Sequence, residues 1–352
     1  MKPVISIVHD IPTRNSAGGI HRYTNETISV LEEKAIALEN YYLSKGEFLL
    51  LGKKRFGTAT RILQYVMTRP HGKIIHSMSL NTLVRKSNYV TIPDIIQQKF
   101  PEIYPKSTFY KKYIERRLKK ALKINMITLT SSVKEDIIKK YNVDSERVSV
   151  VYPYIEPWTF KFTGNSPYSD SEKTHLVTVT DFDPRKDLTP VIKAVNETTE
   201  AELYVIGSNP SNSSFEEKYR KMAGERKRIK FLGRVPTETL VNYLSHSDFL
   251  IHNTLDEGFG FTPLEAMSCG VTPIVPELAV FKETLGNDAL YFANDNKISV
   301  TQIKEIIERP SINKKSATTL LARAGLFSME NFSNQLIEAY NKFPGVNFNY
   351  HP

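Results

Sequence analysis

The sequence predicts an α/β protein made of two doubly wound, Rossmann-like domains, and three observations lead to that fold class. The chain has 352 residues, which suits two domains of roughly 150 to 180 residues better than one hydrophobic core. Short β-branched runs alternate with longer segments of helical spacing, and this alternation predicts parallel sheets covered by helices on both faces. A segment rich in Pro, Ser, Gly and charge, residues 155–175, separates two such series.

The first series begins at the N-terminus. Its strand candidates are short apolar runs rich in Val and Ile, and its helix candidates repeat apolar residues every three or four positions. We expect strands at 3–10, 73–79, 88–94, 124–132 and 148–154, with helices at 19–38 and 132–141.

The second series restarts at residue 175. We expect strands at 175–181, 201–208, 228–235, 248–254 and 271–277, with helices at 188–198, 237–247 and 262–270. In doubly wound folds ligands bind beyond the carboxyl ends of the strands. The two domains, 1–157 and 158–330, are therefore expected to face each other across a cleft that holds the ligand.

The stretch "DEGFGFTPLEAMSCG" (256–270) follows the expected strand at 248–254. Its local pattern predicts a capping box, with Thr262 as the N-cap and Pro263 at the first helical position. Glu265 would then reach back to the Thr262 amide. This interpretation leaves Glu257 unexplained.

The glycines of the same stretch add a second prediction. Gly258 and Gly260 remove side chains where the backbone must turn or approach a ligand. A helix N-terminus behind a glycine-rich turn presents free N–H groups to an anion. The loop therefore suits a ligand that carries phosphate, with the Glu257 carboxylate beside it.

Two further pairs of residues lie where strands give way to loops. Gly18 and Gly19, in "SAGGIHRYT", open the first helix of the first domain, and a diphosphate held between the domains would meet both helix N-termini. Arg185 and Lys186, in "VTVTDFDPRKDL", follow the first strand of the second domain. They are either cations that neutralise a leaving diphosphate or exposed turn charges.

These motifs resemble those of the retaining glycosyltransferases of family 4. "DEGFGFTPLEAMSCGVTPIV" is similar to the family's pair of glutamates eight residues apart, and "SAGGIHRYT" to its N-terminal glycine loop. "VTIPDIIQQKFPEIYP", "ITLTSSVKEDI", "FDPRKDL" and "FLGRVPTETL" occur in the family's order and spacing. The resemblance extends to about residue 295; its specific part is the stretch 256–270, and the other motifs are supportive.

The resemblance implies the GT-B fold and transfer of a sugar from a nucleotide-diphospho-sugar with retention at the anomeric carbon. It implies that Glu265 hydrogen-bonds the nucleotide ribose and that Glu257 lies near the donor sugar. The backbone amides of one loop would hold the sugar hydroxyls and the phosphate. That loop consists of Gly258, Phe259, Gly260, Phe261 and Thr262.

The same resemblance assigns the remaining roles. Gly18 and Gly19 would approach the diphosphate, and Lys186 would neutralise the leaving group. The implied mechanism is front-face, with the leaving phosphate helping to deprotonate the acceptor; whether Glu257 acts as a nucleophile stays open. No metal and no cofactor besides the donor substrate are expected. By family analogy, the C-terminal helix within 331–352 packs back on the first domain.

The sequence departs from the family pattern in the second domain. Asp181 stands where the family commonly has an arginine, and a carboxylate cannot stabilise a diphosphate directly. In one interpretation Arg185 replaces the missing cation. In another, Asp181 and Asp183 hold a divalent metal.

A second departure lies in the first domain. Pro93 precedes Asp94 where the family usually has His-Asp, with the histidine near the donor sugar and acceptor. His76, at the end of a neighbouring strand, is a candidate to fill part of this gap as a catalytic residue, together with Asp94. A structural role for His76 is the alternative.

The composition and the distribution of charge indicate which kinds of binding partner to expect. The net charge is +9, and residues 111–123, "KKYIERRLKKALK", carry seven basic residues around a thin apolar line. This helix presents either a solvated face or contact with a membrane surface. Nucleic acid is not expected, because no recognised nucleic-acid motif accompanies the charge. A single cysteine, Cys269, the absence of a membrane-spanning run and a first apolar run too short for a signal peptide predict a cytoplasmic protein, with peripheral membrane contact left open.

The predicted function is thus a retaining, hexosyl-type glycosyltransferase that uses a nucleotide-sugar donor and a glycan or lipid-linked acceptor. The alternative is a nucleotide-sugar-binding subunit or pseudo-enzyme with weak or no turnover. The sequence does not specify the donor base, the sugar, the acceptor, the linkage or the oligomeric state.

Overall fold

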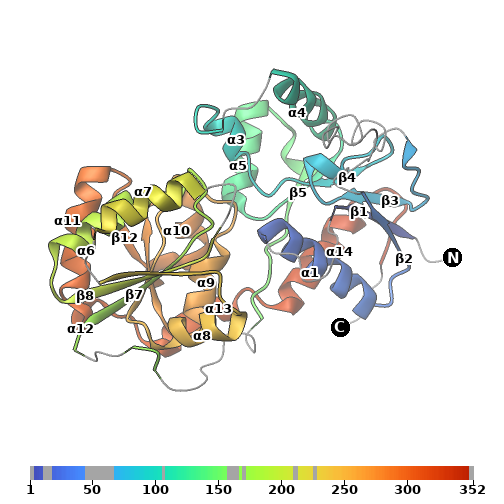
Figure 1. The fold of residues 1–352 in the computed structure, drawn as a ribbon. Coiled ribbons are helices and arrows are strands. Elements are labelled where there is room, and N and C mark those ends of the chain that lie inside the picture. The colour runs from blue at the N-terminus through green and yellow to red at the C-terminus, as the bar shows by residue number, and fades with distance from the viewer. Residues whose placement is uncertain are drawn as a thin grey trace, which may run out of the picture. The chain divides into compact units, whose positions relative to one another are not determined.

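The protein is described by a computed structural model that covers residues 4–10, 18–43, 67–104, 108–156, 166–168, 172–208, 213–224 and 228–348 (Figure 1). The chain forms two compact units. The first comprises Met1–Tyr154 together with Met329–Pro352, and the second comprises Ile155–Ser328. The expected linker at 155–175 lies partly outside the described residues. Each unit is an α/β layer structure, as the alternating apolar runs predict.

The first unit is built on a six-stranded parallel sheet with strand order β2-β1-β3-β4-β5-β6. Its strands are β1 (Ile5–His9), β2 (Leu38–Tyr42), β3 (Ile74–Ser77), β4 (Tyr89–Thr91), β5 (Asn125–Thr128) and β6 (Val148–Val150). Its longer helices are α1 (Gly19–Glu33), α4 (Thr108–Ala121), α5 (Ser131–Tyr141) and α14 (Met329–Asn341). Short helical turns lie at α3 (Ile96–Lys99), η1 (Leu80–Thr82) and η2 (Ser145–Arg147).

The helix expected at 19–38 is shorter than predicted. It ends at Glu33, and Ala35 adopts a φ of 51°, a left-handed conformation that a helix cannot continue through. The chain then pairs Leu38 with Ile5, so β2 extends the sheet in parallel beside β1. Ile36 and Leu38 satisfy both helical and strand spacing, which is why periodicity alone misplaced them.

The last long helix, α14, belongs to the first unit although it follows the whole of the second unit in sequence. In Figure 1 it lies beside α1 on one side of the sheet, and the Tyr23 and Phe332 rings meet edge to face at 5.5 Å. The Gln335 side chain accepts a hydrogen bond from the Tyr152 amide beyond β6. Aromatic burial of this kind holds chain-distant elements together.

The opposite side of the first sheet is covered by α4 and α5 (Figure 1). Leu118 and Ala121 of α4 pack in one cluster with Met126 and Val90 of the sheet. The apolar line expected along 111–123 therefore faces the core of its own unit.

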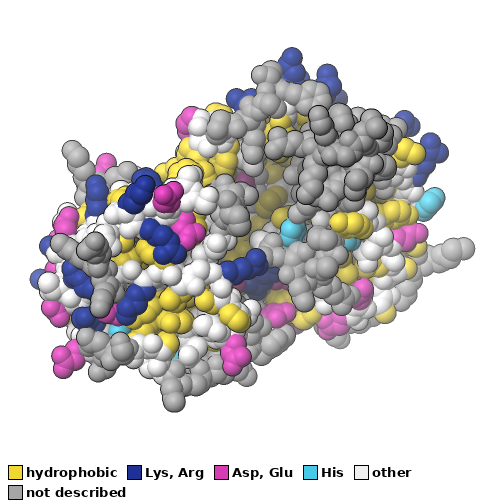
Figure 2. Space-filling view, viewed as in Figure 1, with side chains coloured by type: hydrophobic (Ala, Val, Ile, Leu, Met, Phe, Trp, Pro, Cys, Tyr) yellow, Lys and Arg dark blue, Asp and Glu magenta, His cyan; other side chains and the backbone are white. Residues whose placement is uncertain are grey.

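The other face of α4 is basic and exposed. Lys112, Arg116 and Lys119 are exposed on one side of this helix, and Lys123, two residues beyond its end, is exposed as well. Figure 2 shows dark blue side chains over this helix. Arg117 and Lys120 are turned inward, where they donate to the carbonyl oxygens of Leu83 and Val84. None of the described helices is long and apolar enough to cross a bilayer.

The second unit repeats the architecture with strand order β12-β11-β10-β7-β8-β9, all in parallel. Its strands are β7 (Thr174–Val179), β8 (Ala201–Ile206), β9 (Ile229–Gly233), β10 (Phe249–Ile251), β11 (Thr272–Pro276) and β12 (Leu290–Phe292). Its helices are α6 (Thr189–Glu197), α7 (Ser213–Ala223), α8 (Thr237–His246), α9 (Phe261–Ser268), α10 (Ala279–Leu285), α11 (Asn296–Ile307), α12 (Pro310–Asn313) and α13 (Ala317–Gly325), with a short turn, η4 (Gly286–Asp288).

Alternate residues of the second sheet point to opposite faces, and both faces are buried. Leu176 and Phe249 lie in a cluster with residues of α6, α7 and α11. Val177 and Leu250, the next residue in each strand, lie in a second cluster with residues of α8 and α9. Because both faces need apolar cover, the strands appear in the sequence as continuous apolar runs.

Candidate functional site

The candidate site is built from two loops of the second unit that follow neighbouring strands. β7 and β10 run in parallel side by side, so the segments after them, 180–188 and 252–260, leave the same edge of the sheet. This is the edge at which doubly wound folds bind ligands. The Leu255 amide donates to the Arg185 carbonyl, which joins the two loops through the backbone.

Arg185 connects the two loops through several side-chain contacts. Its Nη1 lies 2.5 Å from Glu257 Oε1, 3.0 Å from the Asp256 carbonyl oxygen and 3.2 Å from Thr254 Oγ1. Its Nε lies 3.7 Å from Asp183 Oδ1. The Arg185 guanidinium therefore binds groups of the protein itself. These contacts give no support to the hypothesis that Arg185 replaces the missing cation that would bind the diphosphate.

Glu257 is held in its ionised form. Burial alone would raise the pKa of this carboxyl group, but the Arg185 guanidinium, the His252 hydrogen bond and the Lys186 charge outweigh burial and hold the pKa well below its usual range. A carboxylate with so low a pKa is a weak base. Its chemistry is that of a fixed negative charge and hydrogen-bond acceptor.

His252, directly after β10, supports the same carboxylate. Its Nε2 lies 3.2 Å from Glu257 Oε1, and its ring meets Phe281 edge to face at 5.9 Å. Burial lowers the pKa of His252, against the opposing effect of Glu257, so the ring is neutral at neutral pH. Because an ionised carboxylate only accepts hydrogen bonds, we assign the proton to Nε2.

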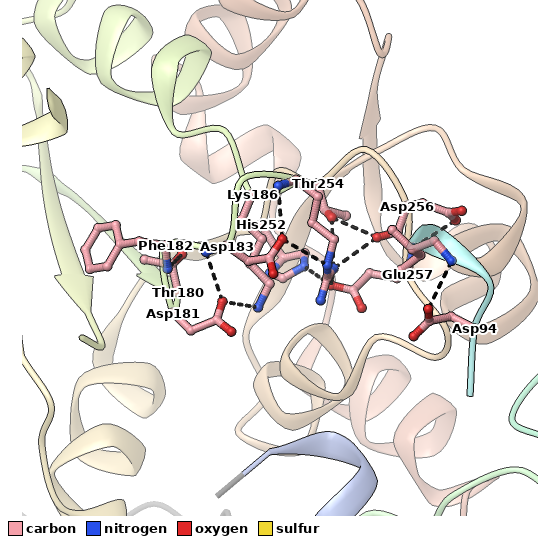
Figure 3. Close-up of polar contacts among 12 residues, drawn as sticks. Asp94, Thr180, Asp181, Phe182, Asp183, Lys186, His252, Thr254, Asp256 and Glu257 are labelled. Carbon is pink, nitrogen blue, oxygen red and sulfur yellow. Dashed lines mark hydrogen bonds and ion pairs between the residues drawn. The ribbon is translucent and has the colours of Figure 1, made fainter. Parts of the chain in front are cut away.

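Lys186 takes part in a separate ion pair. Its Nζ lies 3.3 Å from Asp181 Oδ1 (Figure 3), and the Lys186 side chain is 15% exposed, whereas that of Asp181 is 54% exposed. Burial opposes ionisation of Asp181, but the Lys186 ammonium outweighs it and lowers the pKa of this carboxyl group. The ammonium thus meets a carboxylate at the position where the family resemblance placed an arginine.

The glycine-rich loop differs from its predicted geometry in one respect. The predicted capping box is wrong: α9 begins at Phe261, and the residue before it, Gly260, is the N-cap, with φ of 89° and no side-chain cap. A Cβ on Gly260 would lie 2.8 Å from the Phe281 ring, so both conformation and space require glycine there. Thr262 therefore lies inside the first turn of α9, and the half-buried Glu265 follows on the same helix.

Other residues of the predicted donor loop are buried. Gly258 and Phe259 have little access to solvent, and the Phe259 ring packs against Phe261 at 5.0 Å and against Phe327 at 5.3 Å. The Phe259 side chain is therefore used in packing against other aromatic rings, and the role that the resemblance implies for this loop stays a prediction.

In the first unit, the predicted residues Gly18, Gly19 and Asp94 lie at the starts of helices. Gly18 is the N-cap of α1 with φ of 120°, and Gly19 is its first residue. Pro93 and Asp94 follow β4, and Asp94 Oδ1 accepts a hydrogen bond from the Ile96 amide, 3.0 Å away, which opens α3 (Figure 3). Pro93 and Asp94 are both half-buried.

His76 has a structural environment. The side chain has no exposed surface, and its Nδ1 lies 2.7 Å from the Tyr340 hydroxyl while its Nε2 lies 2.8 Å from Thr91 Oγ1. Burial lowers the pKa of His76 to about 3. Both ring nitrogens are used to join β3 and β4 to α14, which supports the structural alternative and gives no support to a catalytic role.

The metal hypothesis for Asp181 and Asp183 can be compared with their contacts. Each of the two carboxylates lies beside a cation, Lys186 and Arg185 respectively. Within the described part of the chain, no cluster of three or more His, Cys, Asp and Glu side chains is arranged to hold a metal ion. The expectation that the protein needs no metal and no cofactor besides the donor substrate stays a prediction.

Sequence reasoning missed His252, Thr254 and Asp256 as members of the site. The sequence feature that could have identified them is a group of polar side chains after the buried run "DFLI" and directly before Glu257. Asn253 belongs with them, because its Nδ2 donates to the Asp187 carbonyl and so ties the two loops together once more.

In sequence, the chain is similar to one family model and to individual known proteins. Residues 163–323 match the family model described as glycosyl transferases group 1. The O-antigen chain mannosyltransferase RfbU of Salmonella typhimurium is 29% identical over 231 residues, which make up 64% of this chain and 62% of that protein. The GPI3 subunit of phosphatidylinositol N-acetylglucosaminyltransferase from Saccharomyces cerevisiae is 26% identical over 182 residues, or 49% of this chain and 40% of that one. The chain therefore matches only part of each relative's length.

Solved structures share the fold over nearly the whole chain. A sucrose-phosphate synthase from Thermosynechococcus elongatus superimposes with a TM-score of 0.79 at 14% identity, covering 98% of this chain and 100% of that one. Anabaena HepE, solved in complex with UDP and glucose, superimposes with a TM-score of 0.70 at 15% identity, covering 97% and 100%. These likenesses confirm the fold predicted from the sequence.

Proposed function

We propose that this chain, which has the GT-B fold and carries a domain of the group 1 glycosyltransferases, moves a sugar from a nucleotide-diphospho-sugar to a glycan or lipid-linked acceptor with retention at the anomeric carbon. One observation carries the proposal. An ionised Glu257 and the cation Lys186 lie on two joined loops at the ligand-binding edge of the second sheet. The relatives support it, since the names of two of them describe sugar transfer.

Each group in the site has a chemical task in this proposal. Lys186 neutralises charge that develops on the leaving diphosphate. The backbone amides at the start of α9 face the donor's polar groups, and Glu265 binds the ribose. Glu257 accepts hydrogen bonds from the sugar and stabilises positive charge at the anomeric carbon, because its low pKa makes it a poor general base.

Two of the predicted roles change in this proposal. Arg185 and His252 position Glu257, and neither contacts the donor diphosphate. His76 holds α14 in place. Asp94 keeps its predicted catalytic role, and Gly18 and Gly19 keep theirs beside the diphosphate.

The acceptor class is proposed from the relatives and from α4. Names of the relatives include an O-antigen chain mannosyltransferase and a subunit of a phosphatidylinositol N-acetylglucosaminyltransferase. The exposed basic side of α4 suits a surface of anionic lipid. We therefore propose that the protein works in the cytoplasm and contacts the membrane peripherally.

Donor binding is tested first by a thermal-shift panel of UDP, GDP, ADP and CMP with their sugars. A ligand that binds only the native state raises its stability by mass action. We expect one nucleoside diphosphate and its sugar to raise the melting temperature selectively. If the whole panel leaves the melting temperature unchanged, the proposed function is wrong.

Transfer is tested with site variants and the selected donor. Glu265→Ala and Lys186→Ala should each lower the rate of donor hydrolysis or transfer, whereas Lys221→Ala should not. Lys221 is a suitable control because it is an exposed lysine of the same unit, paired with Glu217 on the surface of α7. Unchanged rates in both site variants would remove Glu265 and Lys186 from the mechanism.

A second candidate function rests on the pairing of Lys186 with Asp181. Because this carboxylate offsets the cation that a leaving group needs, the chain would bind a nucleotide-sugar with weak or no turnover. Saturable nucleotide binding without transfer from any donor would favour this alternative.

A further inference from the structure

The role of Asp181 in the candidate site is open to inference from its contacts. Its carboxylate lies 3.3 Å from the ammonium of Lys186, the cation to which the proposed function assigns the leaving diphosphate. The Asp181 side chain is 54% exposed, so it stands at the surface of the site and not in its core. A phosphate that reaches Lys186 meets this carboxylate as well.

The turn that carries Asp181 has supports besides the Asp181 carboxylate, which accepts a hydrogen bond from the Asp183 amide 3.4 Å away. Phe182 has 1% exposed surface and a φ of 53°, and its amide donates to Thr180 Oγ1, 3.0 Å away. The neighbouring strand end is fitted closely against the turn, since a Cβ on Gly207 would lie 1.8 Å from the Thr180 carbonyl oxygen. Burial of Phe182 and this close fit hold the turn, so neutralising Asp181 should leave it folded.

No other cation of the two loops can take the place of Lys186. Arg185 is bound to Glu257, Thr254 and the Asp256 carbonyl. In the ion pairs of the two loops, three carboxylates, Asp181, Asp183 and Glu257, face the two cations. A diphosphate adds further negative charge to a group that already carries more carboxylates than cations.

We propose that Asp181 competes with the donor diphosphate for Lys186 and thereby weakens the binding of nucleoside diphosphates. The inference rests on the proposed function. Asp181 then influences both donor affinity and product release, because its carboxylate pairs with Lys186 again when the diphosphate dissociates. Like charges near a bound anion lower its affinity, and salt screens this effect.

The test is calorimetric titration of the intact chain with UDP, GDP and ADP and with the matching monophosphates. For the diphosphate that the parent binds, Asp181→Asn should bind about two- to fivefold more tightly, as expected for a partly exposed charge pair. The gain should be smaller for the monophosphate, which carries less charge, and should shrink in roughly 0.5 M salt.

Two control variants separate charge from other effects. Asp181→Glu keeps the negative charge and should bind nearly as the parent does. Glu217→Gln removes a carboxylate from an exposed lysine pair of the same unit, away from the two loops, and should leave the affinity unchanged.

The outcomes are distinct. If the parent binds a nucleoside diphosphate and Asp181→Asn binds it equally or more weakly, the inference about Asp181 fails and the proposed function stands. If neither the parent nor Asp181→Asn binds any of the diphosphates, the proposed function fails, and the inference fails with it.

Discussion

Arg185 Nη1 lies 2.5 Å from Glu257 Oε1, and this ion pair joins two loops that are 72 positions apart in sequence. Both side chains are mostly buried, with 17% and 14% of their surfaces exposed. The pair therefore fixes a negative charge at the ligand-binding edge of the second sheet. Removing either partner leaves a mostly buried charge without its nearest opposite charge, which is costly.

This relationship predicts strong coupling between the two residues. Arg185→Met should lower the free energy of unfolding by about 3 kcal/mol, because Glu257 then keeps only the His252 hydrogen bond and the weaker effect of the Lys186 charge. The double variant Arg185→Met/Glu257→Gln should lose at least about 1 kcal/mol less than the sum of the single variants. Denaturant unfolding of the parent, the two single variants and the double variant measures this double-mutant cycle. Additive losses of stability would show that the two residues do not act as a unit.

The burial of His76 predicts a specific dependence of stability on pH. Its pKa is about 3 in the folded protein, below the ordinary value of 6.5, so the unfolded chain binds its proton more readily. The stabilisation is complete above pH 6.5 and is lost as the pH falls from 6.5 towards 3. Within this window His76 contributes a slope that approaches about 1.4 kcal/mol per pH unit.

The measurement compares unfolding free energies of the parent and His76→Gln at several pH values from neutral to acidic. His76→Gln should show the shallower decline, since the amide does not titrate. The slope is the readout, because the absolute stability also changes with the hydrogen bonds to Tyr340 and Thr91. Equal slopes in the two proteins would contradict the assignment of a buried, neutral His76.

The start of α9 depends on the glycine at position 260. Gly260→Ala should lower stability by about 1 to 3 kcal/mol, because alanine meets both a strained φ of 89° and the Phe281 ring. Gly224→Ala is the matched control, since Gly224 has a φ of 66° and nothing within 4 Å of an added Cβ. It isolates the conformational cost, so a Gly260→Ala loss no larger than that of Gly224→Ala would show that the Phe281 contact adds nothing.

The exposed side of α4 predicts binding to anionic vesicles. The triple variant Lys112→Gln, Arg116→Gln, Lys119→Gln should weaken binding to phosphatidylserine vesicles by about 1 kcal/mol for each charge removed. Lys218, Arg220 and Lys221 of α7 provide a control triple with the same residue types, also exposed. Vesicle sedimentation at low and high salt measures both variants. Equal weakening by the two triples would mean that net charge alone is responsible.

The sequence by itself determined the helices, strands and turns that depend on residues close together in the chain. Apolar runs predicted most strands, though not β2 or β12, and helical spacing predicted α1, α5, α6, α8 and α9 but not α7, α10, α11 or α13. The glycines of 256–262 predicted a tight turn before α9. Local patterns failed where two interpretations fit the same residues. Leu38 suits a helix and a strand equally, and Thr262 and Glu265 match a capping box that the left-handed Gly260 replaces.

Only the tertiary structure decided which side chains meet at the site. β7 and β10 are neighbours in the sheet although two strands come between them in the chain, and this order brings Arg185 to Glu257. His76 became structural because α14 returns to cover it with Tyr340. The sequence by itself determined which residue types the loops carry. Their partners, and hence their charge states, follow from packing between segments far apart in the chain, which no local pattern encodes.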